Sequence, residues 1–203
     1  MSNVPRQTKY CLSLTGAGTY RAETLEAARA FIECRDWGEV RRLIVEENLI
    51  SLNSEGNRKR IGGEIIKRLN TLDTEELDFF AHALDDDQLA MLWIALCRTY
   101  PIVHSLAREI LVPRYANMAP DLPKTAYTAF ADDIAFEHPE YARLTDSSKK
   151  KIEIRIFGML RDCRLIDGDF KITPLYPSER FVSLLRETAP KDLELLPKVG
   201  ALL

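Results

Sequence analysis

Residues 36–72 constrain the fold of this chain most, because their apolar spacing predicts two consecutive helices joined by a polar turn. Asp36 can cap the first helix, since its carboxylate can accept hydrogen bonds from the free amide groups of the first turn. One face of that helix is apolar and consists of Trp37, Val40, Leu43 and Ile44. Asn48 tolerates the left-handed conformation that often ends a helix. The stretch therefore predicts a helix-turn-helix unit, residues 36–70.

The second helix of this unit, which Asn53 or Ser54 can cap, combines an apolar stripe with a cationic face. Ile61, Ile65 and Leu69 recur at intervals of four residues and define the buried side. The basic side chains of this helix are Arg58, Lys59, Arg60, Lys67 and Arg68. A buried stripe with cations on the opposite side is what a DNA recognition helix requires.

A simpler interpretation of the same helix is a solvated face held by salt bridges. Arg60, Glu64 and Arg68 are spaced four residues apart, and oppositely charged side chains at that spacing interact on a helix surface. The residues alone leave both interpretations open. Gly62 and Gly63 each lower helix propensity by about 1 kcal/mol relative to Ala, which indicates a close helix crossing or backbone approach at that point.

Composition excludes several classes of protein. The longest apolar run, residues 89–97, is far shorter than the roughly 20 residues that span a bilayer. The four cysteines lie far apart without a CxxC pair, and no signal peptide precedes them, so we expect reduced thiols in a cytoplasmic protein. The net charge of the 203 residues is −3, so any nucleic-acid binding must come from local cationic patches.

The rest of the chain predicts an all-α globular bundle. Further helices are expected over residues 21–34, 74–84, 89–99, 124–137 and 178–187. Another is expected to begin at Pro101 and to end around residues 112–118. A loop with Pro120 and Pro123 marks the best internal boundary, which predicts an N-terminal region, residues 1–118, and a C-terminal region, residues 119–203.

Two segments near the N-terminus are the exceptions to the helical pattern. Residues 9–14 alternate weakly and predict a short extended segment. The glycine pair within residues 15–19 is similar to a phosphate-binding turn, but Arg21 stands where the third glycine would be, and no βαβ pattern follows. We therefore expect a turn that leads into the helix at residues 21–34.

A second basic stretch, residues 145–173, predicts a helix followed by a hairpin. Asp146 or Ser147 can cap this helix, and Ile152 and Ile156 lie on its apolar face. Its cations are Lys149, Lys150, Lys151, Arg155, Arg161 and Arg164. Residues 167–169, with the sequence Asp-Gly-Asp, lie between two apolar segments and suit the turn of a small β-hairpin. This order is typical of a winged helix, in which the wing touches the phosphate backbone; a surface helix with a connecting turn is the alternative.

No catalytic or metal-binding pattern stands out. His82, His104 and His138 are isolated, and no P-loop lysine motif or GxSxG elbow occurs. Asp85, Asp86 and Asp87 precede a helix, where acids complement the helix dipole without a metal ion. We therefore expect a protein that is not an enzyme and that needs no metal and no other cofactor.

The residues quoted above occur in an order that resembles the BrxA family of the bacteriophage exclusion (BREX) defence systems of bacteria. The resemblance is carried by KYCLSLTGAG at the start, the helix that begins at Asp36-Trp37, the basic helix over residues 54–69, and the late KKKIEIRIFGMLRDCRLID segment. It covers most of the chain in layout, and it rests on a pattern rather than on a signature motif.

The resemblance implies an all-helical protein with two helix-turn-helix elements that binds double-stranded DNA and acts with other BREX components, including a DNA methyltransferase. The implied DNA contacts on this sequence are Arg58, Lys59, Arg60, Lys67, Arg68, Lys149, Lys150, Lys151, Arg155 and Arg161. Glu64 within the first cationic face and the negative net charge depart from a strongly basic DNA-binding surface.

The hypothesis is therefore a cytoplasmic, non-enzymatic DNA-binding accessory protein that is a monomer on its own. One alternative is a protein-interaction scaffold of the defence complex, in which the basic helices contact acidic protein surfaces. Another is a transcriptional regulator that binds an operator as a dimer.

Overall fold

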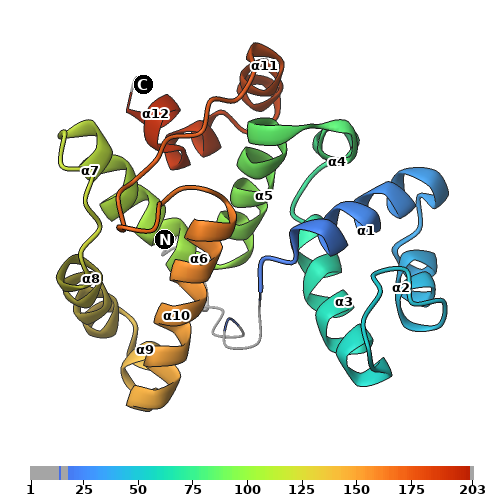
Figure 1. Ribbon diagram of the computed structural model, residues 1–203, viewed down its shortest axis with the longest axis horizontal. Helices are drawn as coiled ribbons and strands as arrows, with labels where there is room; N and C mark the ends of the chain where they lie inside the picture. Colours follow the sequence, from blue (N-terminus) through green and yellow to red (C-terminus); the bar gives the residue numbers. More distant parts are fainter. Residues whose placement is uncertain (1–13, 15–17, 202–203) are drawn as a thin grey trace, which may run out of the picture.

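Short polar caps and apolar stripes divide this chain into helices, and the computed structural model describes them for residue 14 and residues 18–201 (Figure 1). The first half contains α1 (Arg21–Cys34), α2 (Trp37–Val45), α3 (Glu55–Leu69), α4 (Thr74–His82), α5 (Asp85–Thr99), α6 (Pro101–Leu106), η2 (Ala107–Leu111) and α7 (Val112–Ala116). The second half contains α8 (Lys124–Glu137), α9 (Pro139–Ala142), α10 (Asp146–Asp162), α11 (Glu179–Thr188), η3 (Pro190–Leu195) and α12 (Pro197–Gly200). The all-α prediction is confirmed for the described residues. The extended segment predicted at 9–14 and the turn predicted at 15–19 lie almost entirely outside them.

The helices α1, α2 and α3 pack against one another, and local signals set their ends as predicted. The Asp36 carboxylate accepts a hydrogen bond of 2.7 Å from the Gly38 amide, and Ser54 caps α3 through the Asn57 amide. Asn48 has a φ of 58°, so it turns the chain in the left-handed conformation after α2. The rings of Phe31 and Trp37 stack with centroids 4.0 Å apart and join α1 to α2.

Gly62 permits the close crossing of α2 and α3. A Cβ atom at Gly62 would lie only 2.6 Å from Cγ2 of Ile44, whereas one at Gly63 would meet no atom within 4 Å. The close approach predicted at this pair of glycines is therefore confirmed at Gly62 and absent at Gly63.

The helix α5 lies at the centre of the fold, and residues 89–97 are buried on all sides. Pro101 starts α6 immediately afterwards, and the chain bends by 119° between α5 and the stretch α6–η2–α7. No single helix in the described ranges has the length and apolar character to span a membrane; only the bent pair of α5 with α6–α7 meets that test, by length and composition.

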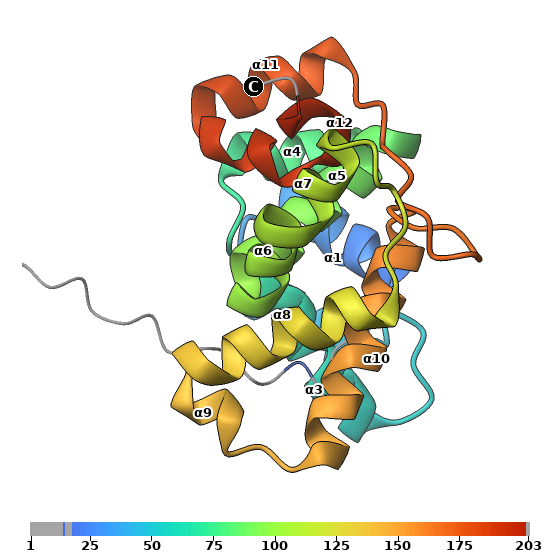
Figure 2. The same ribbon diagram turned by 90° about the vertical axis from the view of Figure 1, so that its left-hand side faces the viewer.

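The end of the described chain returns to this central helix. Indole Nε1 of Trp93 donates a hydrogen bond of 3.0 Å to the Leu195 carbonyl, so α5 is joined directly to η3. The helix α12 packs on α7, and α11 packs on α4 (Figures 1 and 2). The segments after residue 178 thus cover helices that precede the predicted boundary at residue 119, and the two-region division stays a prediction.

The predicted wing is not formed. Only isolated antiparallel bridges occur there, one between Ile166 and Ile172 and one between Asp121 and Lys171. Phe170 has a φ of 61°, and its ring packs edge-on against Phe157 of α10 at 5.7 Å between centroids. The turn therefore folds back onto α10 in a conformation that ends strand pairing. The cap of α10 also differs from the prediction, because Thr145 rather than Asp146 or Ser147 accepts the Ser148 amide.

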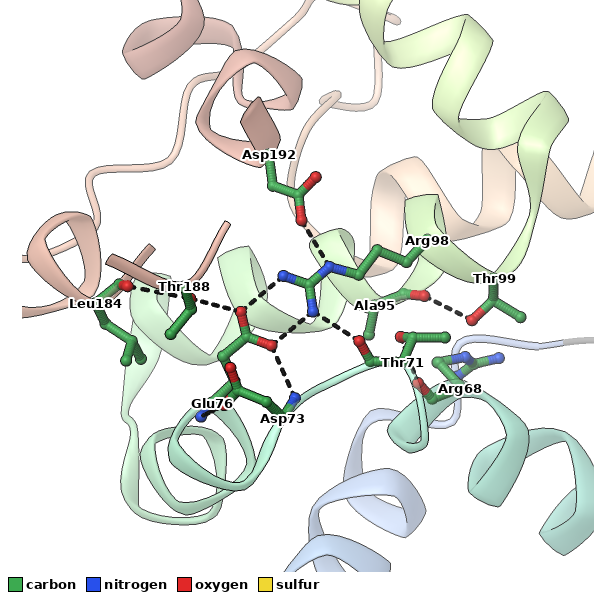
Figure 3. A network of polar contacts seen from close by, with 10 residues as sticks. All are labelled: Arg68, Thr71, Asp73, Glu76, Ala95, Arg98, Thr99, Leu184, Thr188 and Asp192. Atoms are coloured by element: carbon green, nitrogen blue, oxygen red, sulfur yellow. Dashed lines mark hydrogen bonds and ion pairs between the residues drawn. The ribbon is translucent and has the colours of Figure 1, made fainter. Parts of the chain in front are cut away.

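Arg98 lies in a buried ionic network that joins α5 to α4, to η3 and to the loop before α4 (Figure 3). Its guanidinium contacts both carboxylate oxygens of Glu76, at 2.6 and 2.7 Å, and one oxygen of Asp192, at 2.6 Å. It also donates to the Thr71 carbonyl at 2.7 Å. The Glu76 side chain is 1% exposed, so the pair depends on its mutual hydrogen bonds rather than on water.

Further hydrogen bonds complete the environment of Glu76. The Asp73 amide and the Thr188 hydroxyl donate to its carboxylate at 3.0 and 2.8 Å, and Asp73 caps α4 in return. Burial opposes ionisation of Glu76, but the hydrogen bonds from Arg98, Asp73 and Thr188 outweigh it and hold the pKa of Glu76 below its ordinary value.

We expect the substitution Gly62→Ala to destabilise the protein by about 1–3 kcal/mol, because the added methyl group overlaps Ile44 in the core. Gly63→Ala is the matched control and should stabilise the protein by about 0.5–1 kcal/mol, because it improves helix propensity without a clash. Urea unfolding followed by tryptophan fluorescence measures both. Equal effects of the two substitutions would contradict the close crossing of α2 and α3.

Replacing Arg98 with Ala should cost about 3–5 kcal/mol of unfolding free energy, because it leaves the buried carboxylate of Glu76 without a counter-charge. Arg42→Ala is the control: that arginine pairs with Glu39 at 2.7 Å on the surface, where such pairs contribute under about 1 kcal/mol. Chemical denaturation at neutral pH compares the variants. A small loss for Arg98→Ala would show that the network is not important for stability.

Acid should weaken the fold through Glu76. Its folded-state pKa is lowered, so its stabilising contribution is present above the pKa of an unfolded glutamate, about 4.3, and is lost as pH falls through the folded-state value. We expect the stability difference between wild type and Glu76→Gln to shrink steadily as the pH is lowered through this range. A constant difference from neutral pH to strongly acidic pH would contradict this linkage.

Candidate nucleic-acid interface

The outer face of α3 presents Lys59 and Arg60 to solvent, opposite the buried Ile61 and Ile65. Lys59 pairs with Glu55 one turn earlier at 2.5 Å, and both side chains remain more than 60% exposed (63% and 61%). Its hydrogen bond and charge hold the pKa of Glu55 below the ordinary value. Exposed pairs of this kind contribute little free energy, so Lys59 can exchange its carboxylate partner for a phosphate at low cost.

Arg58 has a structural role at the start of α3. Its Nε donates to the Val45 carbonyl at 2.8 Å, and one terminal nitrogen donates to the Leu52 carbonyl at 3.4 Å. These bonds join the end of α2 and the connecting loop to α3. Arg58 thus shapes the loop beside the exposed cations and is itself only partly accessible.

Arg68 is completely buried, and its position corrects the surface implied by the family resemblance. Its two terminal nitrogens donate to the carbonyls of Thr19 and Gly18 at 2.6 and 2.9 Å. A duplex cannot reach this guanidinium in the present fold, and we leave Arg68 out of the proposed contact surface. The burial also removes Arg68 from the solvated row of charges that the spacing of Arg60, Glu64 and Arg68 suggested.

Glu64 and Lys67 form a small cluster with Tyr100 at the edge of the same helix. The Tyr100 hydroxyl donates to Glu64 at 2.7 Å, and Lys67 Nζ lies 3.9 Å from the same carboxylate oxygen. The ammonium group also lies 5.2 Å from the centroid of the Tyr100 ring. Lys67 is therefore half-buried and already engaged within the protein.

The helix α10 carries the second group of cations. Lys150, Lys151, Arg155 and Arg161 are exposed along it. Lys150 pairs with Glu153 at 2.8 Å on the surface, and the Arg161 guanidinium lies 4.9 Å from the centroid of the Phe170 ring. Lys149 differs from these residues, because it is half-buried over the ring of Tyr141 at 5.7 Å.

Two exposed cations extend this surface beyond the residues implied by the resemblance. Arg164 follows the end of α10 in the left-handed conformation, and Lys171 is next to Phe170 in the turn that packs on the helix. The sequence placed Arg164 among the cations of the basic helix and Lys171 in the predicted hairpin. Both residues lie close to the basic helix in the sequence, and this proximity is the signal that could have added them to the predicted DNA contacts.

Several arginines of this molecule hold the fold together instead of facing solvent. Arg58, Arg68 and Arg98 each hold backbone carbonyls or buried acids, since a planar guanidinium with several donors can satisfy multiple acceptors at once. The lysines of α3 and α10 are mostly exposed, and Lys59 and Lys150 make surface ion pairs. A count of positive charges along a helix therefore overstates the surface available to phosphate.

The two basic helices lie in the same half of the molecule, away from α11 and α12 (Figures 1 and 2). The C-terminal ends of the two helices reach the same core, since Leu69 of α3 and Cys163, which follows α10, belong to one cluster of buried residues. Burial raises the pKa of the Cys163 thiol to about 12, although the Arg68 charge opposes this shift. The structure therefore joins the C-terminal ends of both helices within one core.

The predicted absence of catalytic and metal sites stays a prediction, and two features of the described chain are relevant to it. Burial raises the pKa of the Cys97 and Cys163 thiols, so neither supplies a reactive thiolate. Within the described ranges, no group of three or more His, Cys, Asp and Glu side chains is placed to hold a metal ion. The Asp85–Asp87 run instead begins α5, and two of its carboxylates accept hydrogen bonds from the Tyr176 and Ser178 amides.

Comparisons with known proteins identify relatives of this chain. The BrxA family model matches residues 8–189. A protein of Escherichia coli O9:H4 (strain HS) described as "BREX protein BrxA" is 27% identical over 145 residues. The matched residues cover 71% of this chain and 66% of that protein, which is just under two thirds of its length. A crystal structure of an uncharacterized protein from Magnetospirillum magneticum superposes with a TM-score of 0.74 over 91% of this chain and 96% of that one, at 17% identity. That likeness shows a shared fold.

Proposed function

The chain belongs to the BrxA family, and from that premise we propose that it is a non-enzymatic accessory protein of a BREX phage-defence system that binds double-stranded DNA. The defence context is supported by the name of the Escherichia coli relative. The proposed binding surface consists of the exposed cations Lys59, Arg60, Lys150, Lys151, Arg155 and Arg161, with Lys67 and Lys149 at its edges.

One observation carries the DNA-binding proposal: an acidic protein displays two separate helices whose outer faces are cationic. The net charge is −3, yet α3 and α10 expose lysines and arginines in the same half of the molecule. Lysine and arginine neutralise phosphates and release condensed counterions, so such a surface favours a polyanion even on an acidic protein. The acidic remainder repels a duplex and so limits the affinity. Release of counterions at the phosphate contacts makes the affinity fall steeply with salt.

Sequence preference should be weak. Apart from the arginines themselves, Asn57 in the first turn of α3 is the exposed side chain on the two helices with a good geometry for reading base edges. Phosphate contacts fix the position of a protein on a duplex but do not identify bases. We propose that other BREX components, including a methyltransferase, supply specificity, and that the protein alone is a monomer.

Fluorescence anisotropy of a labelled duplex, titrated at several salt concentrations, tests the proposal helix by helix. The double substitutions Lys59→Ala with Arg60→Ala, and Lys151→Ala with Arg155→Ala, each remove two positive charges from one helix. Each should lower affinity and reduce the log–log salt slope by about 0.9 for every phosphate contact that is lost.

Arg108→Ala with Lys191→Ala is the matched control, because it removes the same charge from exposed positions on η2 and η3. The control should bind DNA with the wild-type slope. If all three double variants lose the same affinity, binding reflects net charge alone and the assignment to α3 and α10 is wrong. If the wild type fails to bind even at low salt, the DNA-binding proposal is wrong as a whole.

A further inference from the structure

A shallow apolar groove of about 300 Å³ lies between α11, α12 and the segment that precedes α11. Its apolar lining includes Leu175, Tyr176, Val182 and Val199, and two cations, Arg186 and Lys198, stand at its edge. The Tyr176 side chain is 62% exposed, although most large aromatic residues of this fold are buried. Tyrosine and arginine are also the residue types that dominate binding energy at protein interfaces.

One wall of the groove is held in place by α5. Asp86 accepts a hydrogen bond of 2.8 Å from the Tyr176 amide. Asp87 accepts bonds of 2.6 and 2.7 Å from the amide and hydroxyl of Ser178. These contacts fix the backbone on both sides of Pro177, so the groove is formed before any ligand arrives, and binding requires little ordering of the protein.

The charge at the groove is positive and unmatched. Neither Arg186 nor Lys198 forms an ion pair with an acid of the described chain, whereas surface cations on α3 and α10 such as Lys59 and Lys150 do. Lys198 Nζ lies 3.9 Å from the centroid of the Tyr176 ring, a cation–π contact that keeps the ammonium group directly at the groove. Arg186 is exposed one helical turn after Val182.

We propose that this groove binds a short acidic segment of a partner protein, with an apolar side chain in the groove and flanking carboxylates on Arg186 and Lys198. An apolar floor adds binding energy for an inserted side chain, and the paired cations select acidic neighbours and disfavour basic ones. A DNA duplex would use the cations but would leave the apolar floor without a matching group, because its bases are stacked inside the double helix. The occupant that fits both parts is therefore a peptide.

The position of the groove allows this interaction to operate independently of DNA binding. In both views, α11 and α12 lie at the end of the molecule opposite the N-terminal ends of α3 and α10 (Figures 1 and 2). A ligand on each surface would leave the other accessible. The inference goes beyond the proposed function and does not rest on it, since it uses none of the residues assigned to DNA.

Selection from a library of random short peptides displayed on phage tests the groove directly, whichever partner protein carries the segment. Selected peptides should combine an aromatic or branched aliphatic residue with aspartate or glutamate. Anisotropy of a selected, labelled peptide should show at least about tenfold weaker binding to Arg186→Glu and to Tyr176→Ala. Two-dimensional NMR of the labelled protein should place the shifts at residues 175–199.

Arg180→Glu is the matched control, because it reverses a charge on the same helix at a separate groove, where its guanidinium lies over Phe79 at 5.5 Å. This variant should bind the peptide as the wild type does.

The proposal is overturned if the library yields no peptide whose binding depends on Arg186 and Tyr176, or if basic peptides are selected. It is also overturned if a DNA duplex added in place of the peptide shifts the same NMR resonances, which would make the occupant a nucleic acid. A DNA titration of Arg186→Glu distinguishes the two proposals. Wild-type affinity for DNA in this variant would leave the proposed DNA-binding surface intact even where the groove proposal fails.

Discussion

The fold depends on one buried ionic contact, in which Arg98 of α5 meets Glu76 and Asp192. The two acids come from α4 and η3, so the guanidinium joins the centre of the chain to a segment 94 residues later. Dehydrating these charges is costly, and the cost is offset only because nearly every donor of Arg98 and both oxygens of Glu76 are satisfied. Such a contact forms in only one packing of α4, α5 and the C-terminal segments, so it favours a single folded arrangement.

This docking also builds the two surfaces on which function is proposed. Because η3 and α12 return to α5 and α7, Lys198 is brought beside Tyr176, and the groove at α11 exists. On the other side, the hydroxyl of Tyr100, the residue that follows α5, donates a hydrogen bond to Glu64 and so supports α3. The central helix thus packs against α3 on one side and against η3 on the other, and so lies between the two surfaces.

The sequence by itself determined the helices and many of their ends, because the signals are local. Asp36 and Ser54 cap the helices that follow them, Asn48 takes the left-handed conformation, and Pro101 starts α6, as the sequence pattern predicted. The family could be recognised for the same reason, since the order of these local features spans most of the chain.

Only the tertiary structure decided which charged side chains face solvent and whether strands pair. Arg68 is buried against the Thr19 carbonyl, which lies 49 residues away in the sequence. The periodicity of a helix carries no information about such a distant acceptor. The predicted wing is reduced to isolated bridges at a turn in which Phe170 has a positive φ and its ring packs against Phe157 of α10. The groove at α11 is likewise made by segments that meet only after α12 has packed on α7. These outcomes depend on contacts between distant residues, and the local pattern of the chain contains no information about them.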